Sequence, residues 1–95
     1  LGLITPLGND LATNWDALCA GRSGIRSITR FDASALPVRI AAEVRDFDAA
    51  DWFDARELKR SDRFCHFAVA AAEQAVQQSG LLQAGLGPDD IGVIV

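Results

Sequence analysis

Apolar positions change their spacing along the chain, and each change marks an expected element. Within residues 11–20 they recur three and four residues apart, which predicts a helix with one apolar face. Its apolar residues are Leu11, Trp15 and Leu18. Asp10 or Asn9 can cap the start of this helix, and Gly21 stands where a helix stops.

Three other stretches predict β-strands. Residues 1–5 and 91–95 are apolar on both faces, as in strands of a parallel sheet that is covered on both sides. In residues 38–44 apolar and charged residues alternate, which predicts a strand with one wet face, at a sheet edge or in a hairpin. Residues 21–37 predict a loop, because glycine and other turn residues interrupt any regular spacing. Three side chains are expected to anchor that loop on a core: Ile25, Ile28 and Phe31.

The second half of the chain predicts two helices in succession. A short helix is expected over residues 55–60, with Asp54 as its cap. A longer helix is expected to begin after Ser61 or Asp62 and to end near Ser79, where a glycine follows.

Small residues fill the middle of the longer helix. Residues 68–72 are four alanines and one valine, so another backbone can approach closely and burial is expected. Residues 81–90 predict a loop or short turn before the last strand. The order of strands and helices predicts the α/β class with a layered sheet.

Composition places the chain among ordinary globular proteins, with 49% hydrophobic and 23% charged residues. No apolar run reaches the roughly 18–20 residues that span a bilayer, and the start shows no secretory signal. A cytoplasmic protein without a membrane segment is therefore expected. The net charge of −4 argues against nucleic-acid binding, which needs a basic excess to displace counterions.

Residue types that carry chemistry are few. Cys65 and His66 are adjacent, so on a helix they point about 100° apart and cannot act as a nucleophile and its base. Cys19 has no base nearby, and one histidine with two separated cysteines cannot form a structural zinc site. Four aspartates lack the glycine and closing glutamate of a calcium loop, which favours a solvated acidic turn with helix caps. They are Asp46, Asp48, Asp51 and Asp54.

A basic cluster stands out in this acidic chain. Arg56, Lys59, Arg60 and Arg63 follow helical spacing, although a break near Ser61 leaves the first three as the surer group. Such a patch can attract an acidic partner. From composition alone, however, a solvated helix face is the favoured interpretation.

The ordered set of short motifs resembles the elongating β-ketoacyl-[acyl carrier protein] synthases over essentially all 95 residues. Any one motif is weak, whereas their common order is specific. The motifs are Leu1-Gly-Leu-Ile-Thr-Pro-Leu-Gly-Asn9, Trp15 to Ile25 with its Gly-x-Ser-Gly-Ile end, Phe31-Asp32-Ala-Ser34, Ile40-Ala-Ala-Glu-Val44, Phe47-Asp48, Lys59-Arg-Ser-Asp-Arg-Phe64, Ala71-Ala72, Ser79-Gly80-Leu81 and Ile91-Gly-Val-Ile-Val95.

The resemblance implies a thiolase-like layered α/β fold, of which residues 1–95 would be an incomplete N-terminal part of the first half. It also implies a cytoplasmic homodimer that performs a decarboxylating Claisen condensation with malonyl-acyl carrier protein, without a cofactor or metal. The family's cysteine nucleophile, two histidines and lysine match no position here, so the chain has no catalytic residue and is expected to be inactive alone. The family's carrier-protein contacts map onto Arg56, Lys59 and Arg60.

Two alternatives remain open from the sequence. The same motifs fit a polyketide ketosynthase or its chain-length-factor subunit, which lacks the active cysteine. From a different class, the chain could be a non-catalytic scaffold or carrier-protein-binding module that uses the basic cluster. The resemblance implies that the acyl pocket, and with it the preferred chain length, is built largely from residues that follow these.

Overall fold

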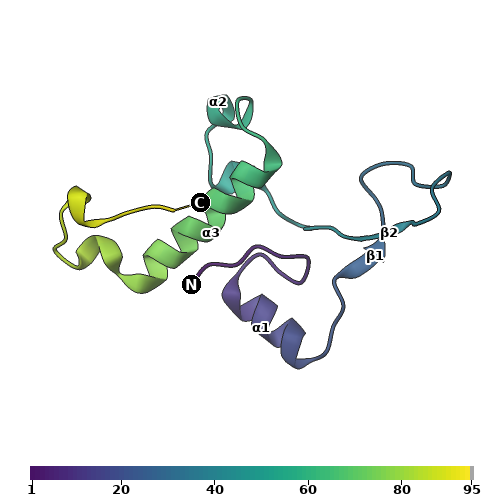
Figure 1. Ribbon diagram of the computed structural model, residues 1–95, viewed down its shortest axis with the longest axis horizontal. Helices are drawn as coiled ribbons and strands as arrows, with labels where there is room; N and C mark the ends of the chain where they lie inside the picture. The colour runs from purple at the N-terminus through teal and green to yellow at the C-terminus, as the bar shows by residue number, and fades with distance from the viewer. Residues whose placement is uncertain (95) are drawn as a thin grey trace.

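The computed structural model describes residues 1–94, which form three helices, one small sheet and three 3₁₀ turns (Figure 1). In chain order the elements are α1 (Leu11–Cys19), β1 (Ile25–Ser27), β2 (Ile40–Ala42), η1 (Ala49–Asp51), α2 (Ala55–Leu58), α3 (Arg63–Ser79), η2 (Leu81–Gln83) and η3 (Pro88–Asp90).

Helix α1 confirms the predicted element and its cap. The Asp10 carboxylate accepts the backbone N–H of Thr13 at 2.8 Å, and this bond is the main reason that the pKa of Asp10 is lowered. The predicted apolar face is not the packed one, because Trp15 and Leu18 are 64% and 59% exposed. The buried residues of α1 are Asn14 and Ala17.

The N-terminal segment does not form the predicted strand over residues 1–5. Instead Thr5 and Gly8 exchange two backbone hydrogen bonds of 2.9 and 3.1 Å and close a tight turn. In Figure 1 this segment runs between α1 and α3, the longest helix. The buried Asn14 amide donates to the Gly8 carbonyl at 2.9 Å, which fixes the turn on α1.

The sheet is a two-stranded antiparallel hairpin, in which Ile25 pairs with Ala42 and Ser27 with Ile40. The predicted strand over residues 38–44 is therefore shorter than expected. The predicted loop over residues 21–37 is wrong in part, because it contains β1. Of the three proposed anchors only Ile28 is half-buried, whereas Ile25 and Phe31 are both 57% exposed.

Helices α2 and α3 confirm the two predicted helices and the break between them. Asp62 occupies the N-cap position of α3 without a side-chain cap bond. Gly80 ends α3 with a φ of 65°, a left-handed conformation that glycine adopts without strain. The small-residue stretch is only partly buried: Ala70 is fully covered, whereas Ala68 and Ala72 are exposed.

The last described residues do not form the predicted terminal strand. Residues 91–94 have no regular structure, and Val93 and Ile94 are 85% and 100% exposed. Val95, the end of the predicted strand, lies outside the described residues. A strand at this position needs neighbouring strands to pair with, and residues 1–94 contain none beside it.

The architecture is open. A compact monomer of 10.2 kDa exposes about 5,300 Å², whereas this chain exposes 7247 Å². Its radius of gyration is 16.4 Å, against about 12 Å for a compact domain of this length. Among the described residues, only three apolar side chains are buried, and all are alanines: Ala17, Ala33 and Ala70. The elements are positioned mainly by hydrogen bonds and local packing instead of a shared core.

Candidate functional site

The three cations that the sequence brings together lie on α2 and the turn that follows it. Arg56 is within α2, Lys59 is its C-cap residue, and the Arg60 amide donates to the Glu57 carbonyl at 3.0 Å. All three side chains are exposed. Within residues 1–94 none of the three forms an ion pair or a side-chain hydrogen bond. We call Arg56, Lys59 and Arg60 the basic cluster.

Two carboxylates, the N-cap Asp54 and Glu57 within α2, are engaged with the backbone. Asp54 accepts the N–H groups of Arg56 and Glu57, both at 2.8 Å, while the Glu57 carboxylate accepts the Asp54 N–H at 3.4 Å. This reciprocal capping box gives a helix of only four residues a defined start. The carboxylates therefore bind amide groups, and the charges of the basic cluster stay available to a partner.

The junction between α2 and α3 is closed by side chains. The Ser61 hydroxyl lies 2.8 Å from the Glu57 carbonyl and 2.9 Å from Nε2 of His66, which is in the first turns of α3. The ring of Phe53, just before α2, lies 5.0 Å from the His66 ring. The sequence argument against a Cys65–His66 catalytic pair agrees with this arrangement, because His66 directs Nε2 to a serine.

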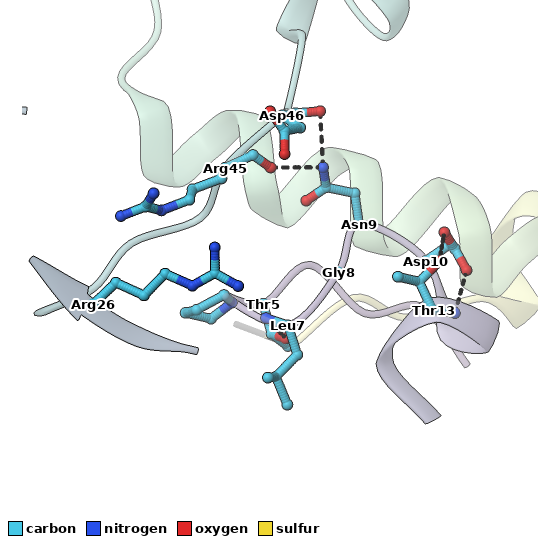
Figure 2. Close-up of a pocket in the computed structure, with 10 residues that line it drawn as sticks. Thr5, Leu7, Gly8, Asn9, Asp10, Thr13, Arg26, Arg45 and Asp46 are labelled. Carbon is cyan, nitrogen blue, oxygen red and sulfur yellow. Dashed lines mark hydrogen bonds between the residues drawn. The ribbon is translucent and has the colours of Figure 1, made fainter. Parts of the chain in front are cut away.

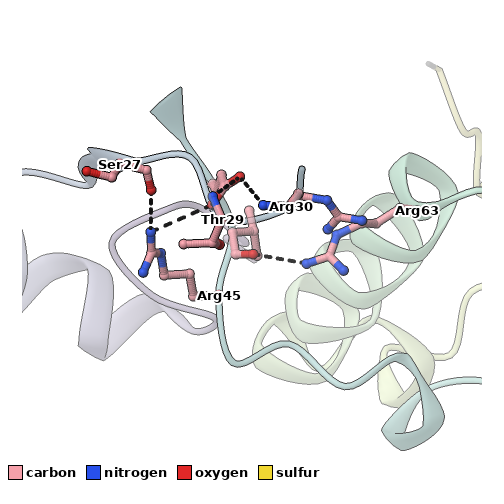
Figure 3. A network of polar contacts seen from close by, with 7 residues as sticks. Ser27, Thr29, Arg30, Arg45 and Arg63 are labelled. Atoms are coloured by element: carbon pink, nitrogen blue, oxygen red, sulfur yellow. Dashed lines mark hydrogen bonds and ion pairs between the residues drawn. The ribbon is translucent and has the colours of Figure 1, made fainter. Parts of the chain in front are cut away.

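Arg63 is separated from the basic cluster. It lies in α3, where its guanidinium donates to the Val44 carbonyl at 2.9 Å and stands 5.0 Å from the centre of the Phe67 ring. Burial is the first cause that lowers the pKa of Arg63, and the positive charge of Arg30 beside it is the second (Figure 3). Arg63 therefore ties α3 to the segment after β2 and is not a surface cation.

A polar network joins the residues that follow β1 to those that follow β2 (Figure 3). The Glu43 carboxylate accepts the N–H and the hydroxyl of Thr29 at 3.1 and 2.8 Å, and the Arg30 N–H at 3.3 Å. Arg45 pairs with the same carboxylate at 3.6 Å and donates to the Ser27 carbonyl at 3.2 Å. The bonds from Thr29 are the leading reason that the pKa of Glu43 is lowered.

The network predicts the effect of Glu43→Gln. In this protein, amide hydrogen exchange at Thr29 and Arg30 should be faster in the variant at neutral pH, because a neutral amide is a weaker acceptor than a carboxylate. Because the pKa of Glu43 is lowered, the wild-type contact is present above its ordinary value of 4.5. The contact is lost as the pH falls through the lowered pKa. Glu73→Gln is the control, and equal exchange in both variants would contradict the assignment.

A second cluster of contacts centres on Asn9 (Figure 2). Its side-chain nitrogen donates to the Arg45 and Asp46 carbonyls, both at 2.9 Å, while its backbone carbonyl accepts from the side-chain amide of Gln74 in α3 at 2.7 Å. Gln74 also accepts the Leu3 N–H at 3.2 Å. Asn9 and Gln74 thus join three segments that are far apart in sequence.

The contacts of Asn9 border an open pocket of about 290 Å³, lined in part by Arg26 and Arg45. No cysteine or histidine lines it, so it offers no cysteine–histidine pair. Residues 1–94 also contain no group of three or more side chains that could hold a metal ion. Asp48 and Asp54 cap short helices, as the alternative to a calcium loop predicted.

Two further findings bear on the sequence predictions. Cys19 is exposed, Cys65 is half-buried, and both are free thiols. Among residues 1–94, no helix is both long and apolar enough to cross a membrane. Within residues 1–94, the basic cluster is a group of exposed cations that a negatively charged partner could contact.

Comparison with known proteins defines the class of this chain. The family described as "Beta-ketoacyl synthase, N-terminal domain" matches residues 1–95. The chain belongs to the β-ketoacyl synthase family, which confirms the resemblance read from its motifs.

Individual relatives within the family share one name. The chain is 52% identical over all 95 residues to 3-oxoacyl-[acyl-carrier-protein] synthase 2 of Synechocystis, and 52% identical over 81 residues, 85% of this chain, to the protein of the same name from Coxiella burnetii. A Staphylococcus aureus protein of that name is 38% identical over 98% of the chain. The chain covers 23%, 20% and 22% of these relatives, so it spans about a fifth of their length.

The fold has a counterpart among solved structures. A structure titled "The ishigamide ketosynthase/chain length factor" matches 96% of this chain and 21% of that one, with a TM-score of 0.75 and 38% identity. This match confirms the thiolase-like α/β fold that the sequence predicts. The complete layered sheet of that fold is not contained in residues 1–94, whose sheet has two strands.

Sequence reasoning found the basic cluster and missed the residues that hold it. The link between His66 and Ser61 is not among the sequence predictions. A serine and a histidine five residues apart across a helix start were the available signal. Asn9 and Gln74, which hold three segments together, gave no signal in the spacing of apolar residues.

Proposed function

We propose that this chain is the N-terminal part of a β-ketoacyl-[acyl carrier protein] synthase of fatty-acid elongation. The names of the relatives at 52% identity over most of the chain support this proposal. The synthase extends an acyl chain by a decarboxylating Claisen condensation with malonyl-acyl carrier protein. It uses no cofactor or metal, acts as a homodimer and works in the cytoplasm.

The contribution of these 95 residues is recognition and not bond making. None of the chain's cysteine, histidine or lysine side chains matches the family's nucleophile or its supporting groups. The acyl chain is therefore carried on a cysteine in another part of the synthase. The proposed role of the basic cluster is to bind the acidic surface of the acyl carrier protein beside the entrance to that site.

The observation that carries this role is the state of the three cations. Arg56, Lys59 and Arg60 are exposed and bind no carboxylate within residues 1–94, while Asp54 and Glu57 are held by backbone amides. Exposed cations of this kind steer an acidic protein and set its orientation, which raises the association rate more than it deepens the complex.

Reversal of the three charges tests the proposal. The triple variant Arg56→Glu, Lys59→Glu, Arg60→Glu, made in the full-length synthase, should lower kcat/KM for carrier-bound substrates about ten- to hundredfold. Small acyl and malonyl thioesters, which do not use the docking surface, should react as in the wild type. The loss should shrink as salt is added, because exposed charges are screened.

A matched control separates local docking from net charge. Arg22, Arg26 and Arg39 are also exposed, and their reversal to glutamate changes the net charge by the same amount. This control should leave carrier-dependent turnover nearly unchanged. Equal losses in both triple variants, or equal losses with carrier-bound and small thioesters, would show that the basic cluster is not the docking surface.

A polyketide ketosynthase or its chain-length factor is the second candidate. The structural match to a ketosynthase/chain length factor at 38% identity supports it. A chain-length factor lacks the cysteine nucleophile, so the full-length protein would form no acyl-enzyme with a radiolabelled acyl thioester. Stoichiometric labelling would exclude that subunit and leave the condensing enzymes.

A further inference from the structure

A helix as short as α2 cannot fix its own position. Four residues form barely one turn, and an isolated helix of that length is unstable in water. Its capping box defines where it starts but does not attach it to the rest of the chain. The basic cluster therefore needs contacts from another element to keep one geometry.

Those contacts come from His66. Its ring packs near Phe53, which precedes α2, and its Nε2 lies 2.9 Å from the Ser61 hydroxyl, which follows α2. A single side chain of α3 thus touches both ends of the segment that carries the basic cluster. We call Phe53, Ser61 and His66 the bracket. All three are half-buried, whereas the cations of the basic cluster are exposed.

The direction of the hydrogen bond follows from counting protons. The Ser61 hydroxyl has one hydrogen, and the Glu57 carbonyl 2.8 Å away can only accept it. The hydroxyl oxygen must then accept from His66, so Nε2 carries a proton. The neutral Nε2–H tautomer and the imidazolium both supply it. The chain of bonds runs from His66 through Ser61 to the last turn of α2.

We propose that His66 and Ser61 are positioning residues for the docking of acyl carrier protein: they tie the segment that carries α2 to α3, so that Arg56, Lys59 and Arg60 face the partner as one surface. This inference rests on the proposed function of the basic cluster. Neither residue touches the carrier protein or the reacting atoms, and each acts through α2.

The test uses three variants of the full-length synthase. His66→Phe keeps a ring beside Phe53 but removes the donor, Ser61→Ala removes the bridge, and His66→Gln keeps a donor nitrogen. The first two should raise KM for carrier-bound substrates about three- to tenfold, the effect of losing one hydrogen bond. Their kcat and their kinetics with small thioesters should be unchanged. His66→Gln should stay within about twofold of the wild type.

A combined variant shows whether the bracket acts through the basic cluster. When Arg56, Lys59 and Arg60 are already reversed, His66→Phe should cause no further change in KM, because coupled residues are not additive. Amide exchange over residues 55–61 should be faster in His66→Phe and Ser61→Ala but not in His66→Gln. A merely structural role would instead lower kcat with every substrate.

The outcomes separate this inference from the function on which it rests. If charge reversal has no selective effect on carrier-bound substrates, the docking surface is wrong and the bracket loses its role. If charge reversal is selective but Ser61→Ala and His66→Phe leave KM unchanged, the docking surface stands and the positioning inference is overturned. Ser61→Ala keeps the test decisive should His66→Phe fail to fold.

Discussion

Alanine at Gly2 is expected to push the N-terminal segment off α3 and to destabilise the full-length synthase by about 1–3 kcal/mol. A Cβ atom at Gly2 would stand 1.8 Å from the carbonyl oxygen of Ala71 and 3.0 Å from the amide nitrogen of Ala75. Both atoms belong to the backbone of α3, so neither can turn aside. The segment must move, and with it the bond from the Leu3 amide to Gln74.

Urea or thermal unfolding of the full-length protein measures this effect. Gly92→Ala is the matched control, because a Cβ at Gly92 meets no atom within 4 Å. The control should unfold at the wild-type midpoint. An unchanged midpoint for Gly2→Ala would mean that the N-terminal segment does not rest on α3.

Produced alone, the 95-residue chain is expected to show no cooperative unfolding transition and to catalyse no condensation. Its buried apolar side chains within residues 1–94 are three alanines, and burial of such small groups cannot offset the entropy of ordering the chain. Exposed apolar residues also line an open hollow of about 360 Å³, among them Leu18 and Ile25. The missing stability should therefore come from contacts made within the full-length synthase.

Calorimetry and dye binding test this expectation. The isolated chain should give a broad, weak heat-absorption profile and should bind a hydrophobic dye such as 8-anilinonaphthalene-1-sulfonate, whereas the full-length synthase should give a sharp transition and bind little dye. A sharp transition from the isolated chain, with little dye bound, would show that these residues form a self-sufficient domain.

Local signals in the sequence predicted the helices well. Asp10, Asp54 and Gly80 define helix ends through their own backbone and side-chain chemistry, which acts over a few residues. The strands were predicted less well, because a strand exists only where a second strand pairs with it. Residues 91–94 have the composition of a buried strand but no pairing partner among the described residues.

In the candidate site, too, local features were predictable from the sequence and contacts between elements were not. Spacing alone revealed Arg56, Lys59 and Arg60 as one group, and the resemblance to condensing enzymes gave that group a partner. Neither could reveal the contact between Ser61 and His66, because it depends on the angle at which the chain leaves one helix and enters the next. Arg63 fits the spacing of the cluster, yet the turn before α3 directs it to the Val44 carbonyl.

Residues 48–60, the segment that carries the basic cluster, are flanked by contacts to α3 at both ends. Phe47 packs edge-on against Phe67 at 5.1 Å where the segment begins, and His66 contacts Phe53 and Ser61 where it returns. Residues 48–60 therefore form a segment that could be replaced as a unit between its two attachments to α3. We propose that related synthases tune their preference for one carrier protein over another by exchanging this segment, while α3 and the catalytic residues stay the same.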